Sequence, residues 1–369
     1  MGSADKDQPL SQSRPAWFPD DAKIAKIRPD GFRRAADMWL AYKLRWKRRQ
    51  LLLRAFRARR DLAVINDRTS NIRPGHVLAF LTARNEIIRL PQFLAHHRAL
   101  GVDHFLIVDN ASDDGTATYL ADQPDVSLWR ASGSYRASRF GMDWLNHLLA
   151  RHGHNHWCLT VDVDELLVIP RGVGRNLREL IDWLDAHRAP ALMALTIDLY
   201  PKGPPGAQQY SATQDPIKVL AWHDANGFIS EVQPRLHNLW VRGGARARMF
   251  FAHDLRRAPT MNKIPLVRWN RRYAYVNSTH TLLPRRLNRL YLRHDLPTAA
   301  LLHTKFLPIV VQKSAEDRIR KEHFTDPAQF DVYYDQVIAD QDMWTEASCR
   351  YSGWQGLEAL GLMTTGNWV

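Results

Sequence analysis

Apolar runs of strand length alternate with segments of helical periodicity from residue 76 onwards. His76–Arg84, Asp103–Asn110 and Val126–Arg130 have the length and composition of buried strands. Between them, Glu86–Leu100 repeats apolar residues at helical spacing, and Thr116–Gln123 is a shorter helix candidate. Such alternation is typical of an α/β fold whose sheet is mostly parallel and flanked by helices.

The alternation continues to residue 200 and then becomes less regular. The pattern predicts, in order, a helix at Ser138–Arg151, a strand, turn and strand at His156–Ile169, a helix at Asn176–His187, a strand at Ala191–Tyr200 and a loop at Pro201–Pro216. Beyond the loop it predicts strands near Phe228–Leu239, Leu266–Val276 and Ala299–Phe306, and a helix at Ser314–His323. Ligands of parallel sheets bind beyond the carboxyl ends of the strands, so the chemistry is expected at Thr82–Glu86, Asp109–Thr116 and Asp162–Glu165.

The N-terminal residues differ from the rest in charge. Residues 1–70 carry 17 Lys and Arg against 8 Asp and Glu, whereas the whole chain of 369 residues has a net charge of +13. Residues 1–22 are polar and show no periodic spacing of hydrophobic residues. We therefore expect residues 1–70 to form a basic, partly flexible helical arm, residues 71–325 to form the α/β domain, and residues 326–369 to form a helical extension.

The segment from residue 23 to residue 60 is basic and amphipathic. It holds 14 basic residues and two acids, Asp30 and Asp37, interleaved with aromatic and aliphatic residues at helical spacing. Two interpretations stay open. The helix lies on an anionic membrane surface, or it docks on the α/β domain and exposes a solvated basic face.

Two further observations limit the class of protein. Cys158 and Cys349 cannot make a disulfide framework or a four-thiolate zinc site, so a bound metal has to use oxygen and imidazole ligands. No run approaches the ~20 apolar residues of a membrane span, and the first residues lack the features of a signal peptide. These observations predict a cytoplasmic protein, peripheral on the inner face of the inner membrane if the basic segment binds lipid.

The strongest candidate for chemistry is the acidic sequence Asp162-Val163-Asp164-Glu165 at the end of an apolar strand. A buried carboxylate needs compensation, and Mg²⁺ or Mn²⁺ suits two acids separated by one residue. Such ions complete their coordination with phosphate oxygens, which predicts a phosphorylated substrate. The alternative is a loop of solvated acids.

A second candidate lies at the end of an earlier strand, Asp103–Asn110. Asp109 at the strand end is suited to accept hydrogen bonds from a base or ribose, whereas Asp113-Asp114-Gly115-Thr116 is suited to cap the following helix.

Together these segments resemble glycosyltransferase family 2 and its relatives of the GT-A fold. The resemblance rests on Leu81-Thr82-Ala83-Arg84-Asn85-Glu86, on Val108–Thr116 and on Val161–Glu165, in this order, and covers roughly residues 75–325. Within the superfamily the sequence is most similar to a bacterial branch with Arg84-Asn85-Glu86, Leu94-Ala95-His96-His97 and Leu100-Gly101-Val102-Asp103-His104.

The resemblance implies roles for individual residues. Thr82, Arg84 and Glu86 line the nucleotide pocket, Asp109 contacts the base, and Asp162 and Asp164 hold the metal on the diphosphate. It also implies a nucleotide-binding half at residues 71–170 and an acceptor half at residues 171–325. A late histidine often completes the metal site in this fold, and His303 is preferred over His280.

Other assignments rest on weaker signals. Arg136 and Arg139 are candidates to stabilise the departing diphosphate, although solvated arginines are common. The general base is not singled out; Glu231 and Asp224 are candidates in the acceptor half, and Asp254 is a further one. Gly243–Arg248 either approaches a diphosphate or is a plain turn, and the histidines at 152, 154 and 156 are read as a polar loop.

The main hypothesis is a metal-dependent, inverting glycosyltransferase of cell-surface polysaccharide synthesis. Its donor is a nucleotide-diphosphate sugar, with UDP favoured, and its acceptor is a saccharide or a lipid-linked glycan. The alternative is a non-catalytic protein that binds nucleic acid or another polyanion on a similar scaffold. Nucleic acid is disfavoured because an acidic cluster in the main cleft repels polyanions. A nucleotidyltransferase ranks last, because Thr82–Glu86 lacks a glycine-rich loop.

Overall fold

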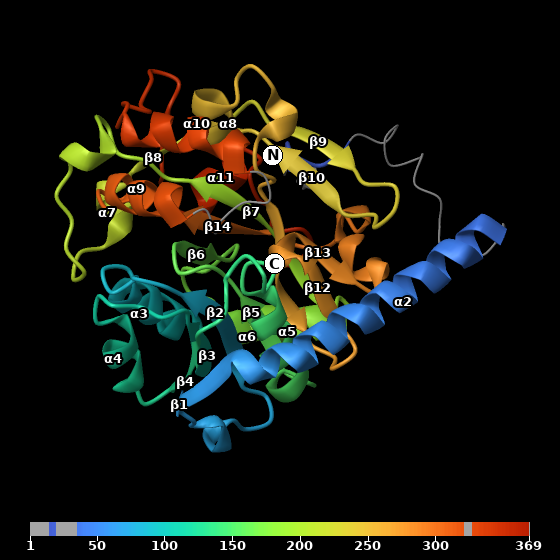
Figure 1. Cartoon of the computed structure of the whole chain (residues 1–369). Helices are drawn as coiled ribbons and strands as arrows, with labels where there is room; N and C mark the ends of the chain where they lie inside the picture. Colours follow the sequence, from blue (N-terminus) through green and yellow to red (C-terminus); the bar gives the residue numbers. More distant parts are fainter. Residues whose placement is uncertain (1–14, 20–34, 321–326, 369) are drawn as a thin grey trace, which may run out of the picture.

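A computed structural model describes residues 15–19, 35–320 and 327–368 (Figure 1). Within these residues, nine strands form one sheet in the order β1-β4-β3-β2-β5-β11-β7-β14-β6. The strands of this sheet are β1 Leu62–Asn66, β2 Val77–Ala83, β3 His104–Asp109, β4 Val126–Ala131, β5 Trp157–Thr160, β6 Glu165–Val168, β7 Ala191–Asp198, β11 Asn262–Arg268 and β14 Ala299–His303. The predicted α/β class is confirmed, with a mixed sheet flanked by helices.

The first half of the sheet is the regular part. Strands β4, β3, β2 and β5 are parallel neighbours and alternate along the chain with helices. These helices are α3 Leu90–Leu100, α4 Thr116–Ala121 and α5 Met142–His152. Every residue of β3 is buried, as expected for a strand covered by helices on both faces. The sheet therefore brings the ends of β2, β3 and β5 to one edge.

The second half of the sheet mixes directions. Strand β11 runs antiparallel to both β5 and β7, and β14 pairs parallel with β7 and antiparallel with β6. Helix α6, Leu177–Ala186, connects β6 to β7 and is capped by Asn176, whose side chain accepts a hydrogen bond from the Glu179 amide at 3.0 Å. The parallel character of the sheet is thus concentrated in its first half.

The remaining elements surround the second half. They are α7 Pro216–Val219, β8 Trp222–His223, β9 Ile229–Val232, β10 Leu239–Arg242, α8 Gly244–Phe250, β12 Ala274–Asn277, β13 Thr281–Leu283, α9 Val310–Arg320, α10 Pro327–Ile338, β15 Cys349–Arg350 and α11 Trp354–Ala359. The strand expected near Phe228–Leu239 is a hairpin of β9 and β10, and the one expected near Leu266–Val276 is split between β11 and β12. Helix α9 begins four residues before the predicted Ser314, and residues 321–323 of that prediction lie outside the described residues.

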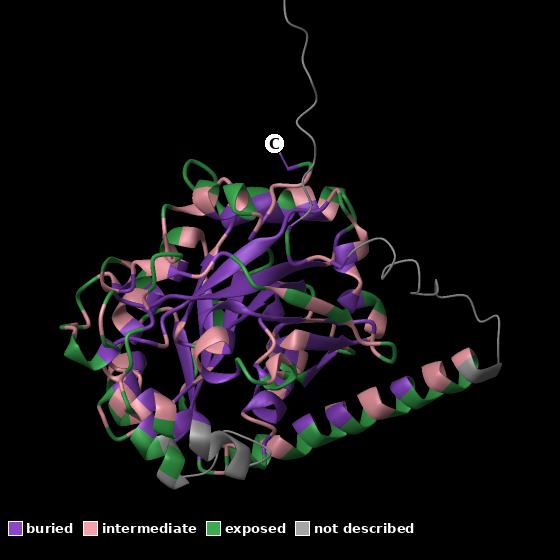
Figure 2. Ribbon diagram, turned by 90° about the horizontal axis from the view of Figure 1, so that it is seen from above, coloured by how far each residue is buried: buried purple, intermediate pink, exposed green. Residues whose placement is uncertain are grey.

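Helix α2, Ala35–Ala58, runs along one side of the molecule and extends past it (Figure 1). Leu44 and Leu51 are buried against Ala274, Val276 and Leu283 of the β12–β13 hairpin. Figure 2 shows buried residues on the side of α2 that faces the body and exposed residues on the other.

The end of α2 is anchored by an ion pair, in which Arg54 Nη2 lies 2.8 Å from Asp143 Oδ2 of α5. Strand β1 follows and pairs antiparallel with β4 at the edge of the sheet. The predicted residues 1–14 and 20–34 of the arm lie outside the described residues.

In the part of the chain that the structure describes, no helix is both long and apolar enough to cross a membrane.

Candidate functional site

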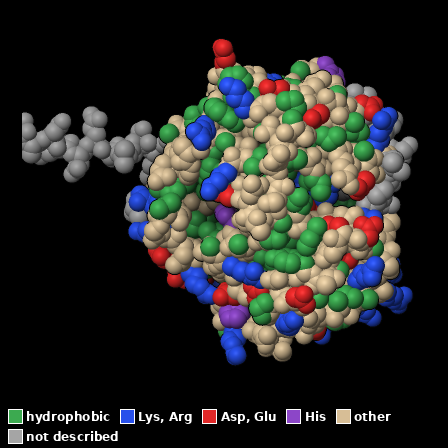
Figure 3. Space-filling view, turned by 90° about the vertical axis from the view of Figure 1, so that its left-hand side faces the viewer, with side chains coloured by type: hydrophobic (Ala, Val, Ile, Leu, Met, Phe, Trp, Pro, Cys, Tyr) green, Lys and Arg blue, Asp and Glu red, His purple; other side chains and the backbone are tan. Residues whose placement is uncertain are grey.

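A cavity of about 450 Å³ opens at the carboxyl ends of β2, β5 and β14. Among the residues that line it are seven site candidates from the sequence, namely Thr82, Arg84, Glu86, Asp162, Asp164, His280 and His303. This volume is within the usual range of small-molecule sites. Figure 3 shows a hollowed face of the molecule on which basic, acidic and histidine side chains gather.

The loop after β2 is held by the loop after β3. Arg84 Nη1 donates hydrogen bonds to the carbonyl oxygens of Asn110 at 2.7 Å and Ala111 at 3.0 Å. The Glu86 amide donates to Thr116 Oγ1 at 2.9 Å, and Asp114 Oδ1 accepts from the Thr116 amide at the start of α4. Asp113-Asp114-Gly115-Thr116, predicted to cap a helix, therefore also holds the loop that lines the cavity.

Asp109 organises a turn and does not line the cavity. Its side chain is completely buried, and its carboxylate accepts hydrogen bonds from the Ser112 amide and hydroxyl. The neighbouring Asn110 is the residue of this loop that reaches the cavity.

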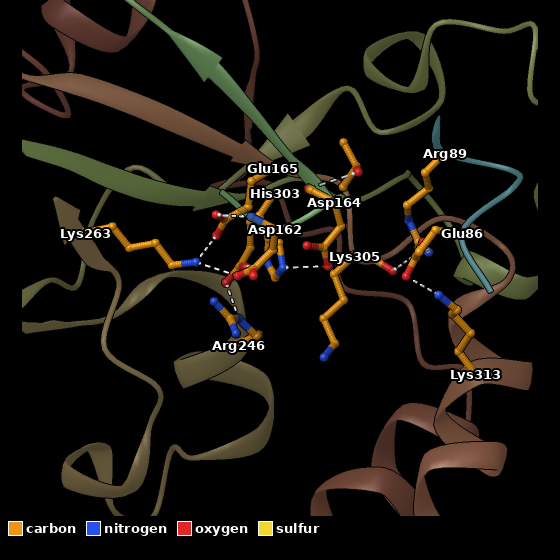
Figure 4. Close-up of polar contacts among 12 residues, drawn as sticks. Glu86, Arg89, Asp162, Asp164, Glu165, Arg246, Lys263, His303, Lys305 and Lys313 are labelled. Atoms are coloured by element: carbon orange, nitrogen blue, oxygen red, sulfur yellow. Dashed lines mark hydrogen bonds and ion pairs between the residues drawn. The ribbon is translucent and has the colours of Figure 1, made fainter. Parts of the chain in front are cut away.

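Two of the three acids in Asp162–Glu165 share one partner, and the third has another (Figure 4). Lys263 Nζ on β11 lies 2.7 Å from both Asp162 Oδ2 and Glu165 Oε1. Glu165 and Lys263 are buried, whereas the Asp162 side chain is 53% exposed. Burial alone would lower the pKa of Lys263, but the two carboxylates outweigh it and raise that pKa. Lys263 is thus the counterion of a buried glutamate, and the sequence offers no signal for it.

Asp164 faces His303. His303 Nε2 lies 3.0 Å from Asp164 Oδ2, and His303 Nδ1 lies 2.7 Å from Asp198 Oδ1 at the end of β7. Burial would lower the pKa of His303, but Asp164 and Asp198 reverse this effect and raise it. Burial would raise the pKa of Asp164, but His303 and then Arg89 and Lys305 hold it well below its usual range.

Cationic side chains surround this pair (Figure 4). Arg246 on α8 donates from Nε to Asp198 Oδ2 at 2.8 Å, and Lys305 extends from the end of β14. Arg89 Nη1 lies 2.8 Å from Glu86 Oε2, and Lys313 on α9 pairs with the other oxygen of Glu86. Of these four side chains, Arg246 is a candidate from the sequence, whereas Arg89, Lys305 and Lys313 are not, although Arg89 lies three residues after Glu86 and Lys305 two residues after His303.

His280 lies on the same cavity. Its Nδ1 is 2.7 Å from the backbone carbonyl oxygen of Asn262. Because a carbonyl oxygen can only accept a hydrogen bond, Nδ1 carries the proton and Nε2 carries a lone pair. Burial, and then the charge of Lys263, lower the pKa of His280 to about 4. The imidazole is therefore neutral at physiological pH.

The remaining candidates lie away from the cavity lining. Arg139 Nη2 is 2.6 Å from Asp143 Oδ1. Asp224 pairs with Arg248 and accepts from the Tyr200 hydroxyl. Glu231 is 63% exposed on β9, and neither it nor Arg136 contributes to the lining.

The donor set fits a divalent cation with two protein ligands. The separation of 3.0 Å between Asp164 Oδ2 and His303 Nε2 is that of adjacent ligands of an octahedral ion with bonds of ~2.1 Å. Asp198 contacts the other ring nitrogen, as carboxylates do behind metal-bound histidines. Within residues 15–19, 35–320 and 327–368, no group of three or more His, Cys, Asp or Glu is arranged to hold a metal ion. Further ligands would have to come from water or a bound phosphate.

Comparisons with known proteins identify no family. No protein-family model and no curated protein matches the chain. Among solved structures, the chain is similar to a crystal structure of 4-diphosphocytidyl-2C-methyl-D-erythritol synthase, with 20% sequence identity and a TM-score of 0.25 over 39% of this chain and 70% of that one. A similarity this weak supports no inference about activity.

Proposed function

We propose that this protein is a metal-dependent glycosyltransferase of the GT-A type that uses a nucleotide-diphosphate sugar. The observation that carries the proposal is the Asp164–His303 pair, because it offers oxygen and imidazole ligands in a cavity that Lys305, Arg246 and Lys313 also line. The resemblance of the three sequence motifs to glycosyltransferase family 2 supports it as well. A UDP-sugar is the favoured donor and inversion the expected outcome.

Each part of the cavity has a role in the proposed reaction. Asp164 and His303 would hold Mn²⁺ or Mg²⁺, with Asp162 beside them, and the ion would neutralise charge on the departing diphosphate. Lys305, which also lines the cavity, would add positive charge where that negative charge develops. Asp198 keeps the His303 ring oriented through Nδ1, and the loop from Thr82 to Glu86 would hold the nucleotide.

The general base is to be found among carboxylates that can reach the acceptor hydroxyl. Glu231 and Asp224 are the candidates from the sequence, and Glu316 of α9 joins them because it lines the cavity. The acceptor is proposed to be a saccharide or a lipid-linked glycan of the cell surface.

The alternative is a protein that binds a polyanion without catalysis. It is less well supported because Arg246 and Lys313, which line the cavity, are already paired with carboxylates. A polyanion would have to displace these pairs.

A thermal-shift screen tests the proposal. UDP, GDP, dTDP, CMP and their sugars are each added with and without Mn²⁺ or Mg²⁺, because a ligand of the native state raises the apparent stability. Stabilisation by one nucleotide only in the presence of metal supports the proposal, and release of the nucleotide diphosphate from its sugar then measures turnover. A response to heparin or DNA and to none of the nucleotides would favour the polyanion-binding alternative.

A further inference from the structure

The outward face of α2 carries a stripe of exposed apolar side chains. Trp39, Trp46 and Phe56 have exposed fractions of 57%, 53% and 53%. Tyr42 and Leu53 lie between them, so consecutive members of the stripe are separated by three, four or seven residues and share one side of the helix. Large apolar side chains gathered on a surface commonly mark an interaction site.

The inner face of the same helix is already occupied. Leu44, Leu51 and Ala55 are buried, the two leucines pack on the β12–β13 hairpin, and Arg54 pairs with Asp143. The stripe therefore does not serve to attach α2 to the protein. The helix is docked on the α/β domain, as one of the two interpretations from the sequence expects, and its outward face is apolar as well as basic.

Basic residues border the stripe. Lys43 lies over the Trp39 ring at 4.9 Å, Arg49 over the Trp46 ring at 6.0 Å, and Arg59, just past the helix, over the Phe56 ring at 3.7 Å. Helix α2 holds seven Lys and Arg and one acid, Asp37. Among these basic residues Arg54 pairs with Asp143. Burial, and then neighbouring arginines, lower the pKa of Lys47 on the inner side.

The aromatic and basic side chains of α2 favour one kind of binding partner over others. A second copy of α2 would bring seven further cations against the first seven, with one acid in each helix to offset them, so helix pairing is opposed by repulsion. Single-stranded nucleic acid is usually held in a basic groove, whereas the stripe lies on the outer side of a helix that extends past the body (Figures 1 and 2). An anionic lipid surface matches both the aromatic residues and the cations.

We infer that α2 binds an anionic lipid surface, with Trp39, Trp46 and Phe56 entering the headgroup layer and Lys43, Arg45 and Arg49 paired with lipid phosphates. The helix lies in the plane of the surface, because its inner face stays attached to the protein. This inference does not rest on the proposed transfer activity.

Co-sedimentation of the full-length protein with vesicles tests the inference. Vesicles of phosphatidylcholine alone are compared with vesicles that contain about 30 mol% phosphatidylglycerol. We expect partitioning onto the anionic vesicles, and at least about a tenfold loss in Trp39→Ala/Trp46→Ala/Phe56→Ala. The matched control is Val173→Ala/Leu360→Ala, which removes exposed apolar side chains elsewhere and should bind normally. A second variant, Lys43→Gln/Arg45→Gln/Arg49→Gln, should lose binding in the same way.

Three outcomes would overturn the inference. The first is equal binding to neutral and anionic vesicles, and the second is binding that the α2 variants leave unchanged. The third is a stable dimer in light scattering that the aromatic variant dissociates, without vesicle binding, because it would assign the stripe to a second copy. As a control, each variant should unfold at the same temperature as the unaltered protein, so that a loss of vesicle binding cannot be due to a loss of folding. Transfer activity in solution is measured separately, so failure of either proposal leaves the other standing.

Discussion

His303 Nε2 lies 3.0 Å from Asp164 Oδ2, although the two residues are 139 positions apart in the chain. The contact exists because β14 pairs antiparallel with β6, the strand that begins at Glu165, and His303 lies opposite Glu165 in this pairing. Backbone contacts reinforce it, since the Thr304 amide donates to the Asp164 carbonyl oxygen at 2.7 Å. The two candidate ligands are therefore held by the sheet and not by a mobile loop.

Removing either ligand should abolish metal-dependent behaviour. Asp164→Asn or His303→Gln is expected to eliminate the Mn²⁺-dependent thermal shift with nucleotide and to lower turnover by at least about 100-fold. Asp198→Asn, which removes only the contact behind His303, should weaken metal affinity by about 10- to 100-fold. The shift and the release of nucleotide diphosphate are measured for all three variants. Unchanged metal dependence in Asp164→Asn would remove the metal assignment.

Lys263 should stabilise the folded protein because it is the counterion of the buried Glu165 carboxylate. Lys263→Met leaves the buried carboxylate of Glu165 without its counterion, which is expected to reduce the free energy of unfolding by about 3–5 kcal/mol. The double variant Lys263→Met/Glu165→Gln removes both charges and should recover much of that loss. Urea denaturation of the two variants provides the comparison. A single variant as stable as the double one would contradict the counterion role.

Gly141 allows α5 to begin directly beside the cavity. Its φ is +75°, and a Cβ atom there would lie 2.7 Å from Thr82 Cγ2. A left-handed backbone conformation costs a non-glycine residue ~1–2 kcal/mol, and Gly141→Ala should reduce the free energy of unfolding by more than this because of the contact with Thr82. The same variant should also weaken nucleotide binding. Gly174→Ala is the matched control, because Gly174 has a φ of +92° and nothing within 4 Å of its Cβ position. Equal losses in the two variants would mean that the Thr82 contact is unimportant.

Lowering the pH should reduce the free energy of unfolding in part because His97 is buried. Burial, and then the charge of His96, lower the pKa of His97 to about 3. In the unfolded chain His97 takes up a proton near pH 6.5, whereas in the folded chain it stays neutral until the pH is near 3. The contribution of neutral His97 to the free energy of unfolding is therefore intact above pH 6.5 and is lost as the pH falls towards 3. At pH 5 the loss from His97 is about 2 kcal/mol. His97→Gln should flatten the slope of unfolding free energy between pH 7 and 5, and exposed His187→Gln measures the background.

The base candidates can be separated by turnover. Glu316→Gln changes a residue that lines the cavity, whereas Glu231→Gln and Asp224→Asn change residues outside the lining. The base variant should lose about 100-fold or more in turnover and retain donor binding. Normal turnover in all three would direct the search to another group.

The regular half of the sheet was predictable because its strands are short apolar runs separated by helical periods. The carboxyl ends of β2 and β5 could be located from the sequence, and with them Thr82, Arg84 and the Asp162–Glu165 cluster. The contacts of Lys263 with Asp162 and Glu165, and the contact of Asp198 with His303, could not. Lys263 and Asp198 lie on β11 and β7, whose positions depend on an antiparallel insertion into the sheet, and a lysine within an apolar strand gives no sign of which carboxylate it meets.

Helix α5 lies between α2 and the cavity. Asp143 on one side of α5 holds Arg54 of α2, while Met142 and Leu145, on another side, line the cavity. The thickness of a single helix, about 10 Å, therefore separates the two. A lipid surface bound to the outward face of α2 would lie beyond the width of α2 as well, so an acceptor anchored in the bilayer would have to project its reacting group about 20 Å from the headgroups to reach the cavity.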